Sequence, residues 1–354
     1  MLNLMKLSNW ASAATDPGVQ LARHKAMDVI TAWNRQGDRN RFLALVNLPI
    51  GEIPPLLGPV PKLAINNCGL AGTVTVPAGV EVANLDHNKI TDIVVHSGLT
   101  SLSACHNPVD RMPASASTTP DAFDHLKFLF LEGTPVEKEL FGELSAWASR
   151  APSPTVEQTR QQGQEIIKAW WKEGDRNKVL SLMNLPIGEM PPLPGFVKRL
   201  AVIHCAIAGP VILPPGIKIA NLENNRITNI TVHPGMTALR AANNRMDRMP
   251  RGTTPDALNH LKTLSLFGNP IILPRNMALP PSLELFEISK ESLIVFAWPR
   301  AGEENAVTIK ATEKTAPREL VAYTEVLHEQ PNQAAFESYK DFIAGIAEQR
   351  HHAP

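Results

Sequence analysis

Hydrophobic residues recur at fixed steps along two long stretches of the chain, with a period of about 20 residues. Each period is apolar at steps one, four, six and eleven, and it carries Asn or Cys at step nine. One such period contains Met236, Leu239, Ala241, Asn244 and Met246. A unit this short cannot fold alone, which is typical of stacked repeats. The pattern therefore predicts a solenoid whose coils each add one short strand to a parallel sheet.

The two stretches are copies of each other. Residues 32–113 align without gaps with residues 169–250, and roughly 45 of about 82 positions are identical. The Pro- and Ser-containing segment between the copies has the composition of an exposed linker. We expect a flexible N-terminus at 1–16, a first repeat unit at 17–150, a linker at 151–156, a second repeat unit at 157–275, and a C-terminal cap or small α+β module at 276–354.

Residues 276–354 leave the repeat pattern. Strands are predicted at 283–288, 292–297 and 307–310, followed by an amphipathic helix that contains Phe336 and Ile346. Because a repeat array exposes an apolar end that must be covered, we expect this segment to be a cap. A partner-docking helix or a small effector module is the alternative.

Step nine has a predicted structural role. An Asn at a sharp turn can bond the backbone of its own coil and of the next coil, and a Cys is a smaller residue that tolerates burial. Cys68 and Cys205 occupy this step, so we expect them to be structural rather than nucleophilic. The three cysteines form no Cys-x-x-Cys pair, and their odd number suits a reducing compartment.

Proline is unusually abundant. The chain contains 31 Pro, and 22 of them lie between Pro49 and Pro135 or between Pro186 and Pro274. The apolar residues are too abundant for a disordered chain, so these prolines are expected inside folded coils. A coil of about 20 residues has no room for a helix on its return path. We therefore expect the convex side to be extended or polyproline in form.

Charge and hydropathy exclude several functions. The 34 Lys and Arg residues balance the 34 Asp and Glu residues, so nucleic acid is not expected as a partner. No apolar window approaches the roughly 18 residues of a membrane span, so membrane insertion is not expected, and no standard secretory signal is recognisable. No motif indicates a cofactor or a catalytic site, so an enzyme is not expected.

The frame Leu-x-x-Leu-x-Leu-x-x-Asn-x-Leu-x-x-Leu-Pro resembles the leucine-rich repeat. With Ile53-Pro54, Met190-Pro191 and Met249-Pro250, it is similar to the short bacterial form found in type III secreted effectors. The resemblance covers about residues 20–137 and 157–275. It implies an α/β fold: a leucine-rich-repeat solenoid in two tandem units, with short parallel strands on the concave face.

The resemblance also implies a capping helix before each array, which contains Trp33 in the first copy and Trp170-Trp171 in the second. The chain departs from these effectors in two ways. They usually carry one longer array, and many continue into a ubiquitin ligase domain whose nucleophile lies in a Cys-x-Asp motif. None of the three cysteines here lies in that motif, so the ligase activity is not implied.

Side chains that flank the inward-pointing residues face the concave side, where a partner is expected to bind. The candidate partner-binding residues are Asn66, Asn67, Asn84, Asp86, His87, Ser103, His106, Arg199, His204, Asn221, Glu223, Asn224, Arg240 and Asn243. Several aligned pairs differ, among them Ser103 and Arg240. Two partners, two patches of one partner, or drift on an unused surface would each explain these differences.

A metal site is one interpretation of Asp86, His87, Cys105 and His106, because they occupy the same two steps of coils about 4.8 Å apart. The second copy has Ala242 in place of Cys105 and Asn in place of both His residues. The same ligands are therefore missing there. We expect a hydrogen-bonding patch at these positions and no metal.

The sequence thus favours a scaffold for protein-protein interaction. The resemblance implies a secreted bacterial effector, a virulence protein that binds a host protein and enters the host cell by a type III-like route. Residues 1–16, rich in Ser, Asn and Ala, suit an uncleaved signal for that route. The alternatives are an interaction protein of the bacterial cytoplasm or envelope, and an enzyme with its site in residues 276–354 or on the concave patch. The oligomeric state is left open.

Overall fold

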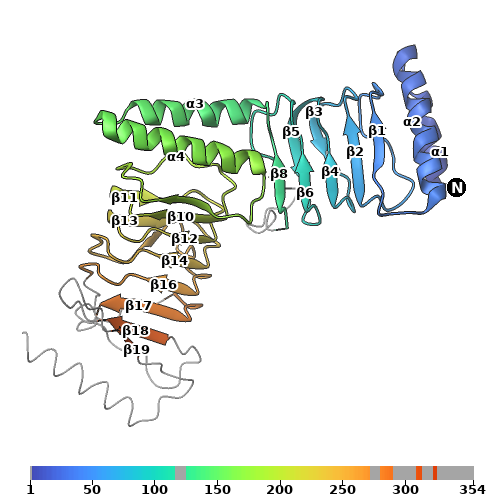
Figure 1. Ribbon diagram of the computed structural model, residues 1–354. Coiled ribbons are helices and arrows are strands. Elements are labelled where there is room, and N and C mark those ends of the chain that lie inside the picture. The colour runs from blue at the N-terminus through green and yellow to red at the C-terminus, as the bar shows by residue number, and fades with distance from the viewer. Residues whose placement is uncertain (1, 116–124, 272–279, 290–307, 313–321, 325–354) are drawn as a thin grey trace, which may run out of the picture. The chain divides into compact units, whose positions relative to one another are not determined.

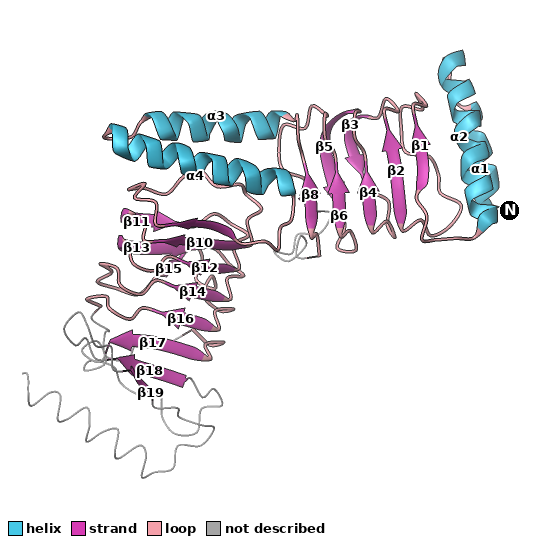
Figure 2. Ribbon diagram, viewed as in Figure 1, coloured by secondary structure: helices cyan, strands magenta, loops and turns pink. Residues whose placement is uncertain are grey.

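The computed structural model describes residues 2–115, 125–271, 280–289, 308–312 and 322–324 (Figure 1). The chain divides into two compact units. Unit 1 is Met1–Ala146 with Ile167–Lys178, and unit 2 is Trp147–Ile166 with Val179–Pro354. Both units combine helices with many short strands, as Figure 2 shows.

Four helices are described: α1 (Leu2–Ser12), α2 (Pro17–Gln36), α3 (Pro135–Ser149) and α4 (Pro154–Glu173). Local sequence fixes the bounds of α2. The Asp16 side chain accepts the N–H of Val19 at 2.8 Å, and Pro17 stands at the first helical position. The helix ends at Gly37, whose φ of 73° is left-handed.

The first 16 residues are not the flexible segment that their composition predicts. Residues Leu2–Ser12 form α1, which packs against α2 and buries Leu7, Trp10 and Ala11. Burial of these apolar side chains stabilises the helix despite the Ser and Asn residues around them. The expected linker at 151–156 is also shorter than predicted, because α4 begins at Pro154, and Pro suits the first turn of a helix.

Unit 1 contains two parallel sheets. The strands of its longer sheet pair in the order β1 (Leu43–Val46), β2 (Lys62–Asn66), β4 (Val82–Asn84), β6 (Ser101–Ser103) and β8 (Phe128–Phe130). The shorter sheet contains β3 (Ala71–Thr75), β5 (Lys89–Val95) and β7 (Ala114–Ser115). Each pass around the coil therefore contributes one strand to the longer sheet, and most passes also contribute one to the shorter sheet.

Unit 2 repeats this arrangement. Its longer sheet begins with β9 (Leu180–Met183), β10 (Arg199–Ile203), β12 (Ile219–Asn221), β14 (Ala238–Arg240) and β16 (Thr263–Ser265). It continues with β17 (Leu285–Ser289), β18 (Thr308–Thr312) and the antiparallel β19 (Ala322–Thr324). The shorter sheet contains β11 (Ala208–Ile212), β13 (Arg226–Val232) and β15 (Arg251–Gly252).

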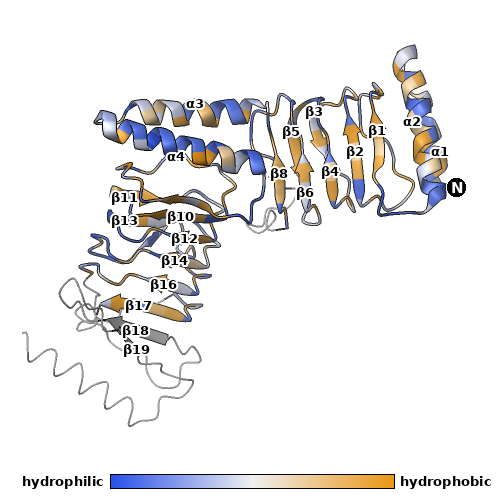
Figure 3. Cartoon of the chain, in the orientation of Figure 1, coloured by the Kyte–Doolittle hydropathy of each residue, from blue (hydrophilic) through white to orange (hydrophobic). Residues whose placement is uncertain are grey.

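The leucine-rich-repeat-type solenoid with short parallel strands is thereby confirmed. The apolar steps of the repeat point inward: Leu63, Ile65, Leu239 and Ala241 are all fully buried. Figure 3 accordingly shows β1, β2 and β17 mostly in the hydrophobic colours and α4 mostly in the hydrophilic ones. Strands β17 and β18 agree with those predicted at 283–288 and 307–310. The strand expected at 292–297 and the helix around Phe336 lie outside the described residues.

An extended or polyproline return was expected on the convex side, and the structure shows the extended form, as the strands of the shorter sheets. In β5, Ile90, Ile93 and Val95 are buried and alternate with exposed or half-buried residues, and such β-branched residues favour strands. The prolines lie mostly outside these strands. Pro210 lies within β11, which is an edge strand, so its missing N–H costs no ladder bond inside the sheet.

The step-nine Asn residues join neighbouring coils, as predicted. The Asn88 side chain accepts the N–H of Cys68 at 2.9 Å and donates to the carbonyl of Ile65 at 2.7 Å. Asn225 makes the same bonds to Cys205 and Val202, at 3.0 and 2.7 Å. Both side chains are buried. They supply partners to backbone groups where the strands end, which would otherwise be buried without hydrogen bonds.

Cys68 and Cys205 have the structural role that the sequence predicts. The thiol of Cys68 donates to the Leu45 carbonyl at 3.3 Å, and that of Cys205 donates to the Leu182 carbonyl at 3.4 Å. Burial raises the pKa of both thiols above the usual value. A thiol with a raised pKa stays protonated, whereas a nucleophilic cysteine needs a lowered one.

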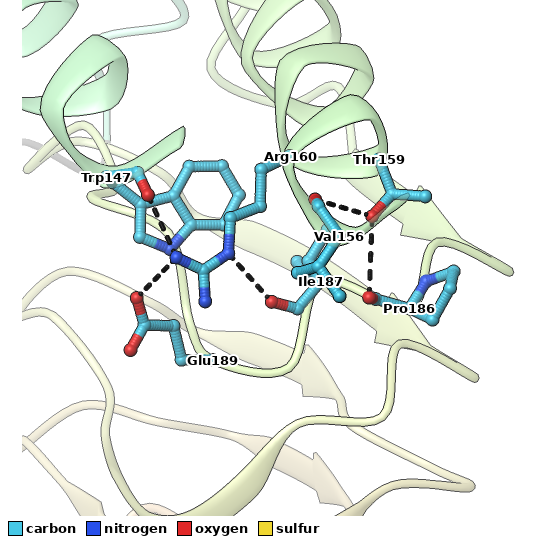
Figure 4. Close-up of polar contacts among 7 residues, drawn as sticks. All are labelled: Trp147, Val156, Thr159, Arg160, Pro186, Ile187 and Glu189. Carbon is cyan, nitrogen blue, oxygen red and sulfur yellow. Dashed lines mark hydrogen bonds and ion pairs between the residues drawn. The ribbon is translucent and has the colours of Figure 1, made fainter. Parts of the chain in front are cut away.

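A buried arginine ties the helices of unit 2 to its first coil (Figure 4). In α4, Arg160 donates to the carbonyls of Trp147 and Ile187, at 2.9 and 3.0 Å, and it pairs with Glu189 at 2.9 Å. Its guanidinium lies 5.1 Å from the centre of the Trp147 ring. These contacts fix where the helix lies over the end of the sheet.

Unit 1 has the same clamp, made by Arg23 of α2. Arg23 donates to the carbonyls of Trp10 and Ile50, both at 3.1 Å, pairs with Glu52 at 2.8 Å and lies 5.0 Å from the Trp10 ring centre. Trp10 is therefore the counterpart of Trp147, 137 positions earlier, which is the offset between residues 32 and 169. The duplication thus extends into α1, beyond the segment that sequence comparison aligned.

The exposed edge of the longer sheet of unit 1 is covered by the turn that follows α4. Leu129 of β8 donates to the carbonyl of Gly174 at 2.9 Å, and Arg176 donates through its backbone N–H to Lys127 at 2.8 Å. The buried Arg176 side chain also donates to the carbonyl of Leu126 at 3.0 Å. This pairing satisfies edge groups that would otherwise be open to another strand.

Candidate functional site

The candidate residues lie on one side of each unit. They are on the outward side of the longer sheet or on the turn that follows each of its strands, and none is buried. We call this side, which was expected to be concave, the long-sheet face. Ser103 and Asn84 end β6 and β4, Asn221 and Arg240 end β12 and β14, and Arg199 begins β10.

Six candidates occupy a left-handed turn just after a strand. Their φ angles lie between 51° and 58°, and the residues are Asn67, His87, His106, His204, Asn224 and Asn243. Asn47 and Asn184 have the same conformation in the first coils. Asn and His tolerate the left-handed region better than most residues. Gly133 and Gly268, with φ of 74° and 72°, follow in the next coil. We call this row the left-handed ladder.

Side chains in the ladder contact their neighbours from coil to coil. Asn67 donates to Asn47 at 2.8 Å, and Asn243 donates to Asn224 at 3.1 Å. The rings of His87 and His106 stack with their centres 4.5 Å apart and their planes 21° apart. The ladder thus holds exposed polar groups in a fixed row along each unit.

Asp86 organises the long-sheet face of unit 1. Its Oδ1 accepts the Ser103 hydroxyl at 2.7 Å and the Cys105 N–H at 2.8 Å, and its own N–H donates to Asn84 at 3.1 Å. Burial is the main cause that raises the pKa of the Cys105 thiol. The structure therefore brings together Asn84, Asp86 and Ser103 in one hydrogen-bonded group, as the patch interpretation expects.

A metal site is the alternative interpretation of Asp86, His87, Cys105 and His106. In the part of the chain that the structure describes, no three His, Cys, Asp or Glu side chains gather closely enough to hold a metal ion. The Asp86 carboxylate instead accepts hydrogen bonds from Ser103 and Cys105.

The same face of unit 2 is organised differently. The Glu223 N–H donates to Asn221 at 3.0 Å, as Asp86 does to Asn84, but Arg240 and Ala242 replace Ser103 and Cys105. No counterpart of the Ser103 hydroxyl is available to the Glu223 carboxylate. The Arg240 side chain is exposed. The two faces therefore share a backbone frame and present different chemistry.

Aromatic side chains complete these faces, and sequence reasoning missed them. Phe128 and Phe130 point outward from β8 with ring centres 6.5 Å apart, and Phe267 follows β16 in unit 2. The candidate residues come from the coils up to β6 and β14 and do not include the last repeat coil of either unit. The strand alternation around Leu129 would have placed Phe128 and Phe130 on this face.

No helix within the described ranges has both the length and the apolar character that a membrane crossing requires. No protein-family model and no curated protein matches the sequence.

Solved structures of leucine-rich-repeat proteins do align with the chain. YopM from Yersinia enterocolitica WA-314 is 14% identical over 88% of this chain and 73% of that chain, with a TM-score of 0.29. YopM from Yersinia pestis, described as a leucine-rich effector protein, is 15% identical over 80% of this chain and 98% of that chain, with a TM-score of 0.23. At these TM-scores, neither neighbour indicates what this chain does.

Proposed function

We propose that this protein is a secreted bacterial effector that binds a host protein through the long-sheet faces of its two repeat units, at 17–150 and 157–275. It acts as a non-catalytic scaffold, and the candidate residues named above form the contacts. Residues 276–354 act as a cap on the second unit. The two faces share one backbone frame and carry different side chains.

One observation carries the proposal. Each unit holds a row of accessible polar side chains in fixed geometry, by strand pairing and by the coil-to-coil contacts of the left-handed ladder. A surface that is already ordered loses little conformational entropy when a partner binds. The effector and host assignments are supported by the resemblance of the about 20-residue repeat to the short bacterial form.

Capture from host-cell lysate tests the binding surface. Wild type is compared with Asn84→Ala and Arg240→Glu on the long-sheet faces and with Arg226→Glu on the shorter sheet, where the side chain is also exposed. We expect the first two variants to lose a captured protein and the third to retain it. If both face variants keep every captured protein, the long-sheet face is not the binding surface.

Export is tested separately. The full chain is fused at its C-terminus to a reporter that is active only in host cytosol, and it is produced in bacteria with an intact or an inactivated type III apparatus. We expect a host signal with the intact apparatus alone. Absence of signal from both strains would favour the non-secreted interaction protein.

A further inference from the structure

The net charge of the whole chain is zero, but the two copies differ in net charge. The aligned segment 32–113 contains 6 Lys and Arg and 6 Asp and Glu, whereas 169–250 contains 10 and 5. The first segment is therefore neutral and the second carries a net charge of +5. Because the two segments align without gaps, the difference comes from substitutions on one scaffold.

Part of this added charge lies on the long-sheet face. Arg240 stands on this face where the first copy has Ser103. Arg199 keeps the positive charge of its counterpart Lys62. Lys218, which precedes β12 and stands where the first copy has Glu81, adds to the charge of the unit. Two arginines therefore lie on strands β10 and β14 of the face in unit 2.

Arg199 and Arg240 are available to a partner. Both are exposed, and neither takes part in an ion pair with another residue of the described chain. Arg240 is flanked by the small residues Ala238, in the same strand, and Ala242, in the turn that follows it. Asn221 lies beside Arg240 in register.

The register sets the spacing of the two arginines. Arg199 pairs with Ile219, and Ile219 pairs with Ala238, which is two residues before Arg240. Two strand spacings across and two residues along place the Cα atoms of Arg199 and Arg240 about 12 Å apart. In an extended chain, residues four positions apart are separated by about 13 Å. Two carboxylates of one extended segment match this separation.

We infer that the long-sheet face of unit 2 binds an acidic, extended segment of a protein partner, whose carboxylates contact Arg199 and Arg240. The inference rests on the proposed function and names the chemistry of the partner at that same face. Guanidinium groups bind carboxylates through paired, charge-assisted hydrogen bonds, which favour such a ligand over a neutral one.

Two features favour an acidic protein segment over nucleic acid. Glu223 follows β12, between the strands that carry Arg199 and Arg240, so a continuous phosphate backbone would meet a like charge there. Single-stranded nucleic acid also needs stacking platforms, and the outward positions of β10, β12, β14 and β16 with their following turns offer only two rings, those of His204 and Phe267. Discrete carboxylates can avoid Glu223, whereas a uniform polyanion cannot.

Binding of a labelled peptide of alternating Glu and Ser to the full-length protein tests the inference, with fluorescence anisotropy as the readout. Arg199→Glu with Arg240→Glu is expected to weaken binding about tenfold or more. Arg226→Glu with Arg245→Glu removes the same charge from exposed positions in and beside the shorter sheet. This control is expected to change affinity by less than about threefold, through long-range charge alone. Arg199→Gln with Arg240→Gln, checked by thermal unfolding, separates lost contact from misfolding.

Three results would overturn the inference: equal weakening by the control pair, no binding of the acidic peptide, or tighter binding of a single-stranded oligonucleotide than of the peptide. The proposed function is judged apart from these. If Arg240→Glu abolishes host-protein capture while the peptide does not bind, the scaffold function stands and the acidic-segment inference fails. If the peptide binds as expected and neither face captures a host protein, the proposed function fails.

Discussion

Asn88 in unit 1 and Asn225 in unit 2 make the same hydrogen bonds, whereas the outward residues beside them have diverged. Arg23 and Arg160 likewise clamp equivalent helices in the two units. On the long-sheet face, Asp86 holds the Ser103 hydroxyl in unit 1, while an exposed Arg240 occupies that place in unit 2. After duplication, the interior kept its bonds because each one is needed to satisfy buried backbone, and the surface was free to change charge.

The largest effect is expected for the shared interior. Asn88→Ala and Asn225→Ala each leave several backbone groups without partners, so each should cost about 3 kcal/mol or more of stability in its own unit. Denaturant unfolding measures the cost, and faster hydrogen exchange at Cys68 or Cys205 locates it. Costs that differ by more than about 1 kcal/mol between the copies would contradict the equivalence of the two interiors.

Substitution of the two clamp arginines should lower stability by a smaller amount, and by different amounts in the two units. Arg160→Met and Arg23→Met remove equivalent bonds, but the Arg160 side chain is 4% exposed and that of Arg23 is 13% exposed. We expect losses of about 2 to 3 kcal/mol for Arg160 and less for Arg23, because the better-buried donor leaves its acceptors less access to water. Thermal unfolding of both variants checks the order, and Glu189→Gln, which changes the exposed partner of Arg160, serves as a mild control.

A single turn position should show effects of opposite sign. Ala206 has φ of 57°, and its counterpart Gly69 has φ of 72° with open space where a Cβ would lie. Ala206→Gly should therefore stabilise unit 2 by about 1 kcal/mol, and Gly69→Ala should destabilise unit 1 by a similar amount. Denaturant midpoints measure both changes. Equal signs for the two variants would show that backbone strain does not distinguish these turns.

Thiol labelling compares the two units at single cysteines and is expected to show the smallest effect. Burial raises the pKa of all three thiols, so their contribution to stability is complete below the ordinary thiol pKa and falls as pH rises above it. The labelling rate of the native protein should be low at neutral pH and should increase with pH, because the thiolate is the form that reacts. Cys105, which is half-buried, should react before the buried Cys68 and Cys205. Mass spectrometry of digested protein identifies the order, and earlier labelling of Cys68 would contradict it.

The repeat frame predicted the inward positions and the bonding role of Asn88 and Cys68, because those residues are constrained in every coil. It also placed the outward candidates on the correct side, since strand alternation follows from the inward positions. Their binding role stays a prediction. The charge difference between the copies went unseen because the net charge of the whole chain is zero.

Two expectations could be decided only by local contacts. Proline content suggested an extended or polyproline convex side, and the extended form is present: alternating residues such as Ile90 and Ile93 form strands there, and most prolines lie outside them. The composition of residues 1–16 suggested a flexible segment, but Trp10 is held by Arg23, a residue that composition does not connect to it. The form of the convex side and the structure of residues 1–16 both depend on contacts that exist only in the folded chain.

The left-handed ladder has a consequence for how many coils an array can hold. A coil inserted between those of His87 and His106 would contact coils of its own type on both sides. The number of repeats is therefore free to change within the row. The row closes at Gly133, where an added Cβ would lie 2.5 Å from the His106 ring, and at Gly268, where it would overlap Asn243. Each glycine therefore ends the row of left-handed Asn and His side chains, although the longer sheet of unit 2 continues beyond Gly268 into β17 and β18.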